Sequence, residues 1–218
     1  MTRIKICGVT RVEDAAWIAA AGADFLGLNF WPRSKRYLPP ERAGAVAAAA
    51  RAGGAARLVG VFVNAAVADI AAITRDVGLD VIQLHGDETP EGVAAVAAAT
   101  GRPVWKAIAV AAPGDLAGLA GWPVEAILLD APTAGRGGAG VVFDWSLARD
   151  ARQHGPAGSA AVRLVLAGGL DPTNVAAAIR ALDPWAVDVA SGVEAAPGIK
   201  DAAKTAAFIA QVRTRPGA

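Results

Sequence analysis

Two residues of this chain are chemically suited to moving a proton: the single cysteine, Cys7, and the aspartate Asp130. A thiol, with a reference pKa of about 8.5, serves as a base when partly ionised, and a carboxyl, with a reference of about 3.9, needs a raised pKa to serve as an acid. One base and one acid are the minimum for moving a proton between adjacent carbons of a sugar. Each residue also has a structural explanation, since a free cysteine is more often a small core hydrophobe and an aspartate often caps a helix or forms an ion pair.

A basic cluster of Arg33, Lys35 and Arg36 offers a second kind of chemistry. Charged clusters on loops are usually just solvated. An arginine on a catalytic face can instead hold a substrate carboxylate by a two-pronged hydrogen bond. We expect only one of the three residues to do so.

The elements that must position these residues alternate regularly along the chain. Eight short, nearly continuously apolar runs are typical of parallel strands buried on both faces: residues 3–7, 24–30, 57–63, 80–84, 103–108, 125–130, 163–167 and 186–190. Helix-like segments follow nearly all of them: residues 12–21, 40–52, 66–77, 90–100, 113–120, 145–153, 172–182 and 202–213.

A repeat of roughly 25–30 residues has the usual size of a right-handed βα unit. An open, doubly wound sheet is the alternative, but eight evenly spaced units favour closure. The sequence therefore predicts an α/β fold: one domain, residues 1–218, forming a single (β/α)8 TIM barrel with a parallel eight-stranded sheet.

Polar residues are concentrated where these strands end. The active site of such barrels lies at the carboxyl ends of the strands, and a need to fold does not readily explain polar residues there. The residues at those positions are Cys7, Asn29 with the loop 33–36, Asn64, His85, Lys106, Asp130, Gly168, Gly169, Ser191 and Gly192.

The pairs Gly168-Gly169 and Ser191-Gly192 are suited to binding phosphate, because glycine lets backbone N–H groups approach a ligand closely. The loops after strands seven and eight often hold phosphate in this architecture, with a short helix that residues 193–196 would supply here. Either pair alone is better explained as turn glycines; both together favour phosphate. The G-x-G-x-x-G run at 135–140 follows the sixth strand, not the first, so a mobile or plain surface loop explains it better than a dinucleotide site.

The composition limits the partners. With a formal net charge of +1, the chain has no general attraction to nucleic acid or to an anionic membrane. One cysteine and two histidines, widely separated, give no metal cluster. The N-terminus lacks the apolar segment of a signal peptide, and no alanine-rich stretch is apolar enough to span a bilayer. We therefore expect a cytoplasmic protein, monomer or homodimer, that binds a small phosphorylated molecule.

The sequence resembles the phosphoribosylanthranilate isomerase family from end to end. The matching stretches are KICGVT, GLNFWPRSKRYL, GVFVN, QLHGDE, LLDA with GRGGAG and FDW, LAGGLDPTNV and DVASGVEAAPGIKD. Each stretch is weak evidence alone, but seven in the same order are highly specific. The resemblance implies the conversion of N-(5-phosphoribosyl)anthranilate to 1-(2-carboxyphenylamino)-1-deoxyribulose 5-phosphate, an Amadori rearrangement in tryptophan biosynthesis that needs no cofactor.

The resemblance also implies residue roles. Asp130 is the general acid that opens the sugar ring, Cys7 is the general base that removes the C2 proton, and Arg36 holds the anthranilate carboxylate. His85 is expected to line the anthranilate pocket and Asp188 to brace the site. The residues expected to bind phosphate are Gly168, Gly169, Ala190, Ser191 and Gly192.

The chain departs from the family at two positions. Ala139 stands where the family usually has threonine or serine, and Ala190 stands where it commonly has serine. Backbone donors survive a change from serine to alanine, so phosphate binding is expected to persist without any hydroxyl contribution.

Three alternatives remain: a related phosphate-binding sugar isomerase or epimerase, a broader isomerase that also accepts the histidine-pathway aminoaldose, and a non-catalytic barrel that binds phosphorylated metabolites. The combination of Cys7, Arg36 and Asp130 argues against the first. The second typically uses an aspartate as the base near the N-terminus, where this chain has Cys7. The third has no need to keep Cys7 and Asp130.

Overall fold

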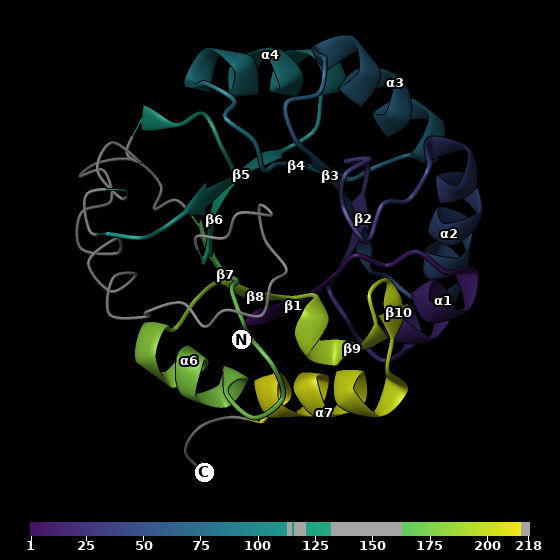
Figure 1. The fold of residues 1–218 in the computed structure, drawn as a ribbon, viewed down its shortest axis with the longest axis vertical. Helices are drawn as coiled ribbons and strands as arrows, with labels where there is room; N and C mark the ends of the chain where they lie inside the picture. Colours follow the sequence, from purple (N-terminus) through teal and green to yellow (C-terminus); the bar gives the residue numbers. More distant parts are fainter. Residues whose placement is uncertain (113–114, 116–120, 132–162, 215–218) are drawn as a thin grey trace.

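The computed structural model is a closed barrel of eight parallel strands, each paired with its neighbours in chain order (Figure 1). It describes residues 1–112, 115, 121–131 and 163–214. The strands are β1 Arg3–Cys7, β2 Phe25–Asn29, β3 Arg57–Phe62, β4 Val81–Leu84, β5 Val104–Ala109, β6 Ala126–Asp130, β7 Arg163–Leu166 and β8 Ala186–Val189. The barrel closes where β1 pairs with β8, with Lys5 opposite Asp188. The predicted (β/α)8 fold is confirmed.

Helices surround the ring of strands, as Figure 1 shows. They are α1 Val12–Ala20, α2 Pro40–Gly53, α3 Val67–Val77, α4 Pro90–Thr100, α6 Val175–Leu182 and α7 Ala202–Arg213. The helix expected at 145–153, and that at 113–120 apart from Asp115, lie outside the described residues, as does the run 135–140. No helix in the described ranges has both the length and the apolar character needed to cross a membrane.

Two expected helices differ from the structure. Helix α6 begins at Val175 rather than at 172, because the side chain of Asp171 accepts hydrogen bonds from the backbone N–H groups of Thr173 and Asn174 and holds these residues in a turn. The short helix expected at 193–196 is not formed. A 3-10 turn, η3 Ser191–Val193, leads instead into the hairpin of β9 Glu194–Ala196 and β10 Ile199–Lys200, which turns at Gly198 with φ +80°.

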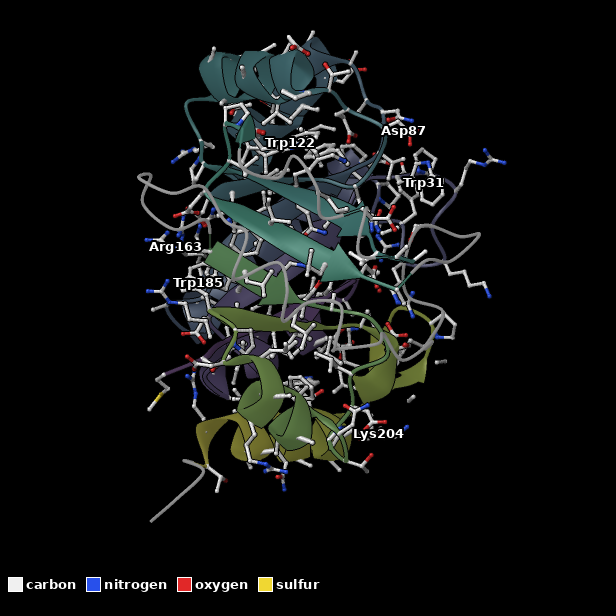
Figure 2. The ribbon with its side chains drawn as sticks, turned by 90° about the vertical axis from the view of Figure 1, so that its left-hand side faces the viewer. Trp31, Asp87, Trp122, Arg163, Trp185 and Lys204 are labelled. Atoms are coloured by element: carbon white, nitrogen blue, oxygen red, sulfur yellow. The ribbon has the colours of Figure 1, made fainter. Side chains whose placement is uncertain are left out.

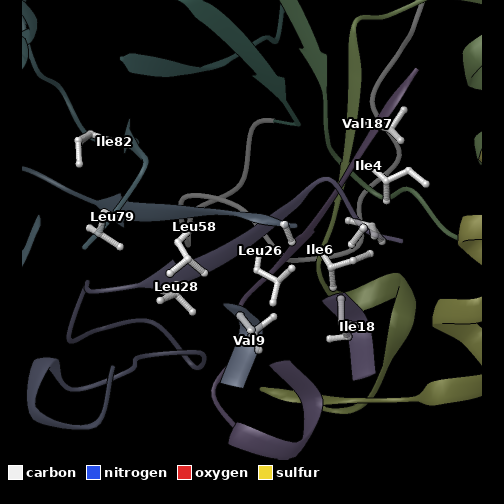
Figure 3. Packing of buried hydrophobic residues seen from close by; sticks show 14 of the residues in the cluster. Ile4, Ile6, Val9, Ile18, Leu26, Leu28, Leu58, Leu79, Ile82 and Val187 are labelled. Atoms are coloured by element: carbon white, nitrogen blue, oxygen red, sulfur yellow. The ribbon is translucent and has the colours of Figure 1, made fainter. Parts of the chain in front are cut away.

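The alternation of side chains along each strand gives the barrel two apolar layers. On β1, Ile4 and Ile6 belong to the outer layer between strands and helices, where they pack with residues such as Ile18 of α1 (Figure 3). Lys5 and Cys7 occupy the opposite, inner face of the same strand. Alternate residues of each strand therefore point either outward to the helices or inward to the barrel interior.

Aromatic side chains fill the barrel at the amino ends of the strands. The rings of Phe25 and Trp105 meet edge to face at 4.9 Å, and Trp185 lies 5.6 Å from Trp105. In Figure 2, Trp185 lies toward one end of the barrel and Trp31 toward the other. Because bulky rings occupy the amino end, the interior can open to a ligand only at the carboxyl end.

Candidate active site

A pocket opens at the carboxyl ends of the strands. Its walls are the last inward-pointing residues of the strands and the loops that follow them: Cys7, Asn29, Trp31, Ser34, Arg36, Val61, Val63, Gln83, His85, Asp130, Ala167, Gly168, Gly169, Leu170, Asp188, Val189, Ala190 and Ser191. The strands beneath the pocket are apolar, so its polar groups are gathered at one place on the barrel.

Cys7 ends β1, is half-buried and lines this pocket. Burial raises the pKa of its thiol above the ordinary value, and the nearby Lys5 ammonium opposes that rise. Gly27 of β2 pairs with Cys7 in the sheet and lies against its sulfur: a Cβ at Gly27 would lie 2.8 Å from Sγ. A side chain at Gly27 would therefore displace the thiol.

Asp130 ends β6 and is only 6% exposed. Its Oδ1 accepts a hydrogen bond from the backbone N–H of Ala131 at 2.8 Å, and its Oδ2 lies 3.5 Å from Nε2 of His85. The other ring nitrogen of His85 is 3.2 Å from Nε2 of Gln83. If the Gln83 amide donates to His85, the neutral imidazole carries its proton on the nitrogen that faces Asp130.

Arg36 is the member of the basic cluster that reaches the pocket, whereas Arg33 and Lys35 are exposed. Its Nε and Nη2 donate to the two carboxylate oxygens of Glu194, each at 2.7 Å. Burial raises the pKa of Glu194, but its contacts with Arg36 and Lys200 outweigh burial and leave that pKa below the usual range. Among the described residues, Nη1 of Arg36 has no hydrogen-bond acceptor, so it can donate to a ligand.

Lys200 joins this ion pair to the strand ends. Its Nζ donates to the backbone oxygen of Cys7 at 2.6 Å, to that of Ala190 at 3.1 Å and to Glu194 at 2.9 Å. The hairpin of β9 and β10 therefore fixes the position of Arg36 relative to β1 and β8.

The loops after β7 and β8 present backbone groups to the pocket. Gly168 and Gly169 have φ of +80° and +64°, which side-chain-bearing residues rarely adopt, so glycine is required there. Neither of their N–H groups donates a hydrogen bond to another described residue. Ala190 and Ser191 line the pocket beside them. Such an arrangement of free N–H groups suits an anion.

Of the five residues expected to bind phosphate, Gly192 alone does not line the pocket. Its lack of a side chain serves packing instead: an added Cβ would lie 2.0 Å from the backbone oxygen of Leu170. The binding of phosphate by Gly192 stays a prediction, and the structure adds that this residue lies against the loop after β7.

We predict that Gly192→Ala lowers the free energy of unfolding by about 1–3 kcal/mol, because the backbone of Leu170 must move. The same variant should bind inorganic phosphate more weakly, since the shifted loop carries Gly168 and Gly169. Urea unfolding and phosphate titration measure the two effects. Gly44→Ala is the matched control: an added Cβ meets nothing within 4 Å, so that helical site should be neutral or slightly stabilised. Equal stability of the Gly192 and Gly44 variants would contradict the packing role.

The other candidate residues, Cys7, Arg36, His85, Asp130, Gly168, Gly169, Asp188, Ala190 and Ser191, all line this pocket. The strand-end residues Asn64 and Lys106 do not. Lys106 turns to the backbone oxygen of Gly86 and to Glu88. Among the described residues, no group of three or more His, Cys, Asp or Glu side chains is placed to hold a metal ion.

Sequence reasoning missed Lys5, Gln83, Glu194 and Lys200. Lys5 is buried and pairs with Asp188, yet it lies in a run read as a plain strand. The spacing from Cys7 could have indicated Lys5, because residues two apart on a strand lie on the same face. Glu194 lies in the segment 193–196, for which a short helix was expected, and Lys200 lies beyond it, so that expectation concealed the hairpin that joins them.

A sequence model of the family described as N-(5'phosphoribosyl)anthranilate (PRA) isomerase matches residues 4–211. The chain belongs to this family. Curated PRA isomerases from Myxococcus xanthus and Ralstonia nicotianae are 47% and 46% identical to it, covering 95% and 97% of this chain and 94% and 93% of their own.

Solved PRA isomerase structures share the fold. One from Thermotoga maritima is 39% identical, with a TM-score of 0.86, and covers 98% of this chain and 99% of its own. Another, in complex with reduced 1-(o-carboxyphenylamino)-1-deoxyribulose 5-phosphate, is 38% identical, with a TM-score of 0.84 and the same coverage.

Of the two positions that depart from the PRA isomerase pattern, Ala190 and Ala139, the structure describes only Ala190. Ala190 lies in the pocket wall, and its backbone oxygen accepts from Lys200. Alanine at position 190 therefore removes a side-chain hydroxyl from the loop, but the hydrogen bond from Lys200 to the backbone oxygen of Ala190 does not depend on that hydroxyl. Ala139 lies outside the described residues.

Proposed function

We propose that this chain isomerises N-(5'-phosphoribosyl)anthranilate to 1-(2-carboxyphenylamino)-1-deoxyribulose 5-phosphate by general acid and base catalysis. The observation that carries the proposal is that one pocket is lined by a thiol, a carboxyl, a guanidinium and two glycine-rich loops. The substrate needs one group of each kind. Its phosphate and carboxylate require anion sites at opposite ends, and its sugar requires an acid and a base between them.

Asp130 acts first in this proposal. It gives its proton to the ring oxygen of the ribose as the bond from that oxygen to C1 breaks, and the lone pair of the anthranilate nitrogen forms the new C1–N double bond. The product of this step is an open-chain Schiff base with a hydroxyl at C4. Burial of Asp130 beside His85 keeps water away from the proton that is transferred.

Cys7 acts second. Its thiolate removes the proton from C2 of the protonated Schiff base, and the electron pair of the C–H bond moves to form the C1–C2 double bond while the nitrogen recovers its electron pair. The resulting enolamine tautomerises to the ketone by gaining a proton at C1 and losing one from the C2 hydroxyl. The substrate's nitrogen accepts the developing charge, so these steps need no further electron sink.

The ends of the substrate are held by the two anion sites. The carboxylate is placed on Arg36, whose guanidinium Glu194 and Lys200 hold in position, and the phosphate on the backbone donors of Gly168, Gly169 and Ser191. His85 and Asp188 line the same pocket. Fixing both ends orients C2 toward Cys7 and the ring oxygen toward Asp130.

We predict that Arg36→Ala raises KM by about ten- to a hundredfold, the equivalent of about 1.5–3 kcal/mol for a hydrogen bond to a charged group. The effect on kcat should be smaller, because the carboxylate is bound in both ground and transition states. Steady-state kinetics give both constants. Arg33→Ala, the same change on an exposed neighbour, is the control and should leave KM unchanged. An unaltered KM in Arg36→Ala would remove the residue from the carboxylate site.

The test of the proposed function is turnover of N-(5'-phosphoribosyl)anthranilate by the purified protein, followed by the loss of substrate fluorescence and by identification of the ketose product. The expected result is conversion to 1-(2-carboxyphenylamino)-1-deoxyribulose 5-phosphate. No turnover by a folded sample that phosphate stabilises against heat would contradict the proposal and favour a phosphometabolite-binding barrel. Turnover of the histidine-pathway aminoaldose at a similar kcat/KM would favour the broader isomerase.

We also propose that residues 1–218 form a single domain, that the protein is cytoplasmic, and that it is a monomer or a homodimer. A structure of the Thermotoga maritima relative is described as monomers generated from a dimeric enzyme, so both states occur for one relative. Sedimentation of the full chain at several concentrations distinguishes the two states.

A further inference from the structure

We propose that Lys5 is a positioning residue that acts through Cys7: its ammonium holds the thiolate in the pocket, and Asp188 holds the ammonium. The inference rests on the proposed role of Cys7 as the base. It assigns a task to a buried charge that the two catalytic steps leave unused, and it gives Asp188 a task besides lining the pocket.

The sheet places the three groups together. Lys5 and Cys7 are two residues apart on β1 and therefore point to the same, inner face of the barrel. Asp188 lies opposite Lys5 in the register between β1 and β8. Lys5 is completely buried, and both oxygens of Asp188 lie 3.0 Å from its Nζ.

The Lys5 ammonium has one N–H bond that Asp188 does not use. An ammonium group has three N–H bonds, and the two oxygens of Asp188 accept two of them. Asp188 leaves the third N–H unused, and the Cys7 sulfur lies on the same side of Gly27 as this ammonium, close enough for the two groups to shift each other's pKa. Burial lowers the pKa of Lys5, but Asp188 and Cys7 more than offset it, so the pKa lies above its ordinary value and the group stays charged.

Gly27 leaves room for this contact from β2. A Cβ at Gly27 would lie 2.8 Å from Sγ of Cys7 and 3.1 Å from Nζ of Lys5, so both groups lie against one glycine. A β-branched or apolar side chain, the usual choice for a buried strand, would push the thiol and the ammonium from their positions. The glycine therefore fits a role in housing the pair.

A purely structural role explains the pair less well. A buried ion pair is often no more stabilising than well-packed apolar residues of similar volume, so stability alone gives little reason for one inside the barrel. A thiol that acts as a base does give a reason for a buried ammonium beside it. Burial raises the pKa of Cys7, and among the charged groups near it Lys5 opposes that rise most strongly, Lys200 also opposes it, and Asp188 adds to it. Arg36 also faces Cys7 as a positive charge.

The test uses the fact that Cys7 is the only cysteine of the chain. The rate of alkylation by iodoacetamide against pH gives the pKa of this one thiol without reference to turnover. In Lys5→Met we expect this pKa to rise by about one to three units, since a cation within a few ångströms shifts a pKa by that much. The acid limb of kcat/KM should move to higher pH by the same amount, because less of the base is ionised at any given pH.

Lys106→Met is the matched control. Lys106 is also a buried lysine paired with a carboxylate, but it does not line the pocket. The Lys106→Met variant should therefore have the same thiol pKa as the wild type and the same acid limb of kcat/KM. If Lys5→Met does not fold, Lys5→Gln decides: its amide can still donate to Asp188 but carries no charge, so the thiol pKa should again rise.

The outcomes separate this inference from the proposed function. An unchanged thiol pKa in folded Lys5→Met, or in folded Lys5→Gln, would overturn the role of Lys5. A raised thiol pKa without any movement of the acid limb would keep the contact between Lys5 and Cys7 but reject Cys7 as the base. Parallel movement of both quantities would support both.

Discussion

Replacing Cys7 by alanine is expected to lower kcat/KM for N-(5'-phosphoribosyl)anthranilate by about 10²–10⁴-fold, the usual contribution of a general base. Once the sulfur is removed, no other group of the described residues lies between Lys5 and Gly27 to act as the base. The backbone there is held by the pairing of β1 with β2 and β8 and by Lys200, so the fold should remain. Steady-state kinetics and a thermal unfolding curve measure the two parts of the prediction.

Cys7→Ser is the control for shape. Serine keeps a small polar side chain in the same position, but a hydroxyl ionises far less readily than a thiol and is a poor base. We therefore expect the serine variant to be nearly as slow as the alanine variant. A serine variant close to the wild type would show that the residue shapes the pocket rather than takes the proton.

Replacing Asp130 by asparagine is expected to reduce kcat/KM by a similar factor, about 10²–10⁴-fold. Asparagine has almost the same shape, and its side-chain oxygen can accept the N–H of Ala131 as the carboxylate does. It cannot give a proton to the ring oxygen and take it back. The loss should therefore appear in turnover and not in the unfolding midpoint.

Asp130→Glu tests whether position matters as well as acidity. It restores a carboxyl group but moves it by one methylene relative to His85 and the substrate. Partial recovery above the asparagine variant is the expected result. Activity in Asp130→Asn close to that of the wild type would contradict the role of Asp130 as the acid.

The barrel and most of the site could be predicted from the sequence because both depend on strand periodicity. Apolar runs show where strands lie, and the polar residues that interrupt them at the carboxyl end, such as Cys7, His85 and Asp130, must meet when the strands close into a ring. Arg36 was identified among three basic residues by the family resemblance, and the structure places it, not Arg33 or Lys35, in the pocket.

The interactions between residues could not be predicted. The spacing of Lys5 and Cys7 puts both on one face of β1, but the partner of the lysine is known only once the closed barrel places Asp188 opposite it. Glu194 and Lys200 required the hairpin, which a helix expectation for 193–196 excluded. The packing requirement for glycine at 192 could not be predicted either, because it comes from the backbone of Leu170 in the neighbouring loop.

The central claim is the division of labour between an acid that opens the ring and a base that removes the C2 proton. Its most direct test is the isotope effect on kcat/KM with substrate deuterated at C2, measured in the residual turnover of two variants. In Cys7→Ser, removal of the C2 proton should limit the rate, so deuterium should slow it strongly. In Asp130→Asn, ring opening should limit the rate, and the effect should fall close to unity. Equal isotope effects in the two variants, or the reverse order, would contradict the account.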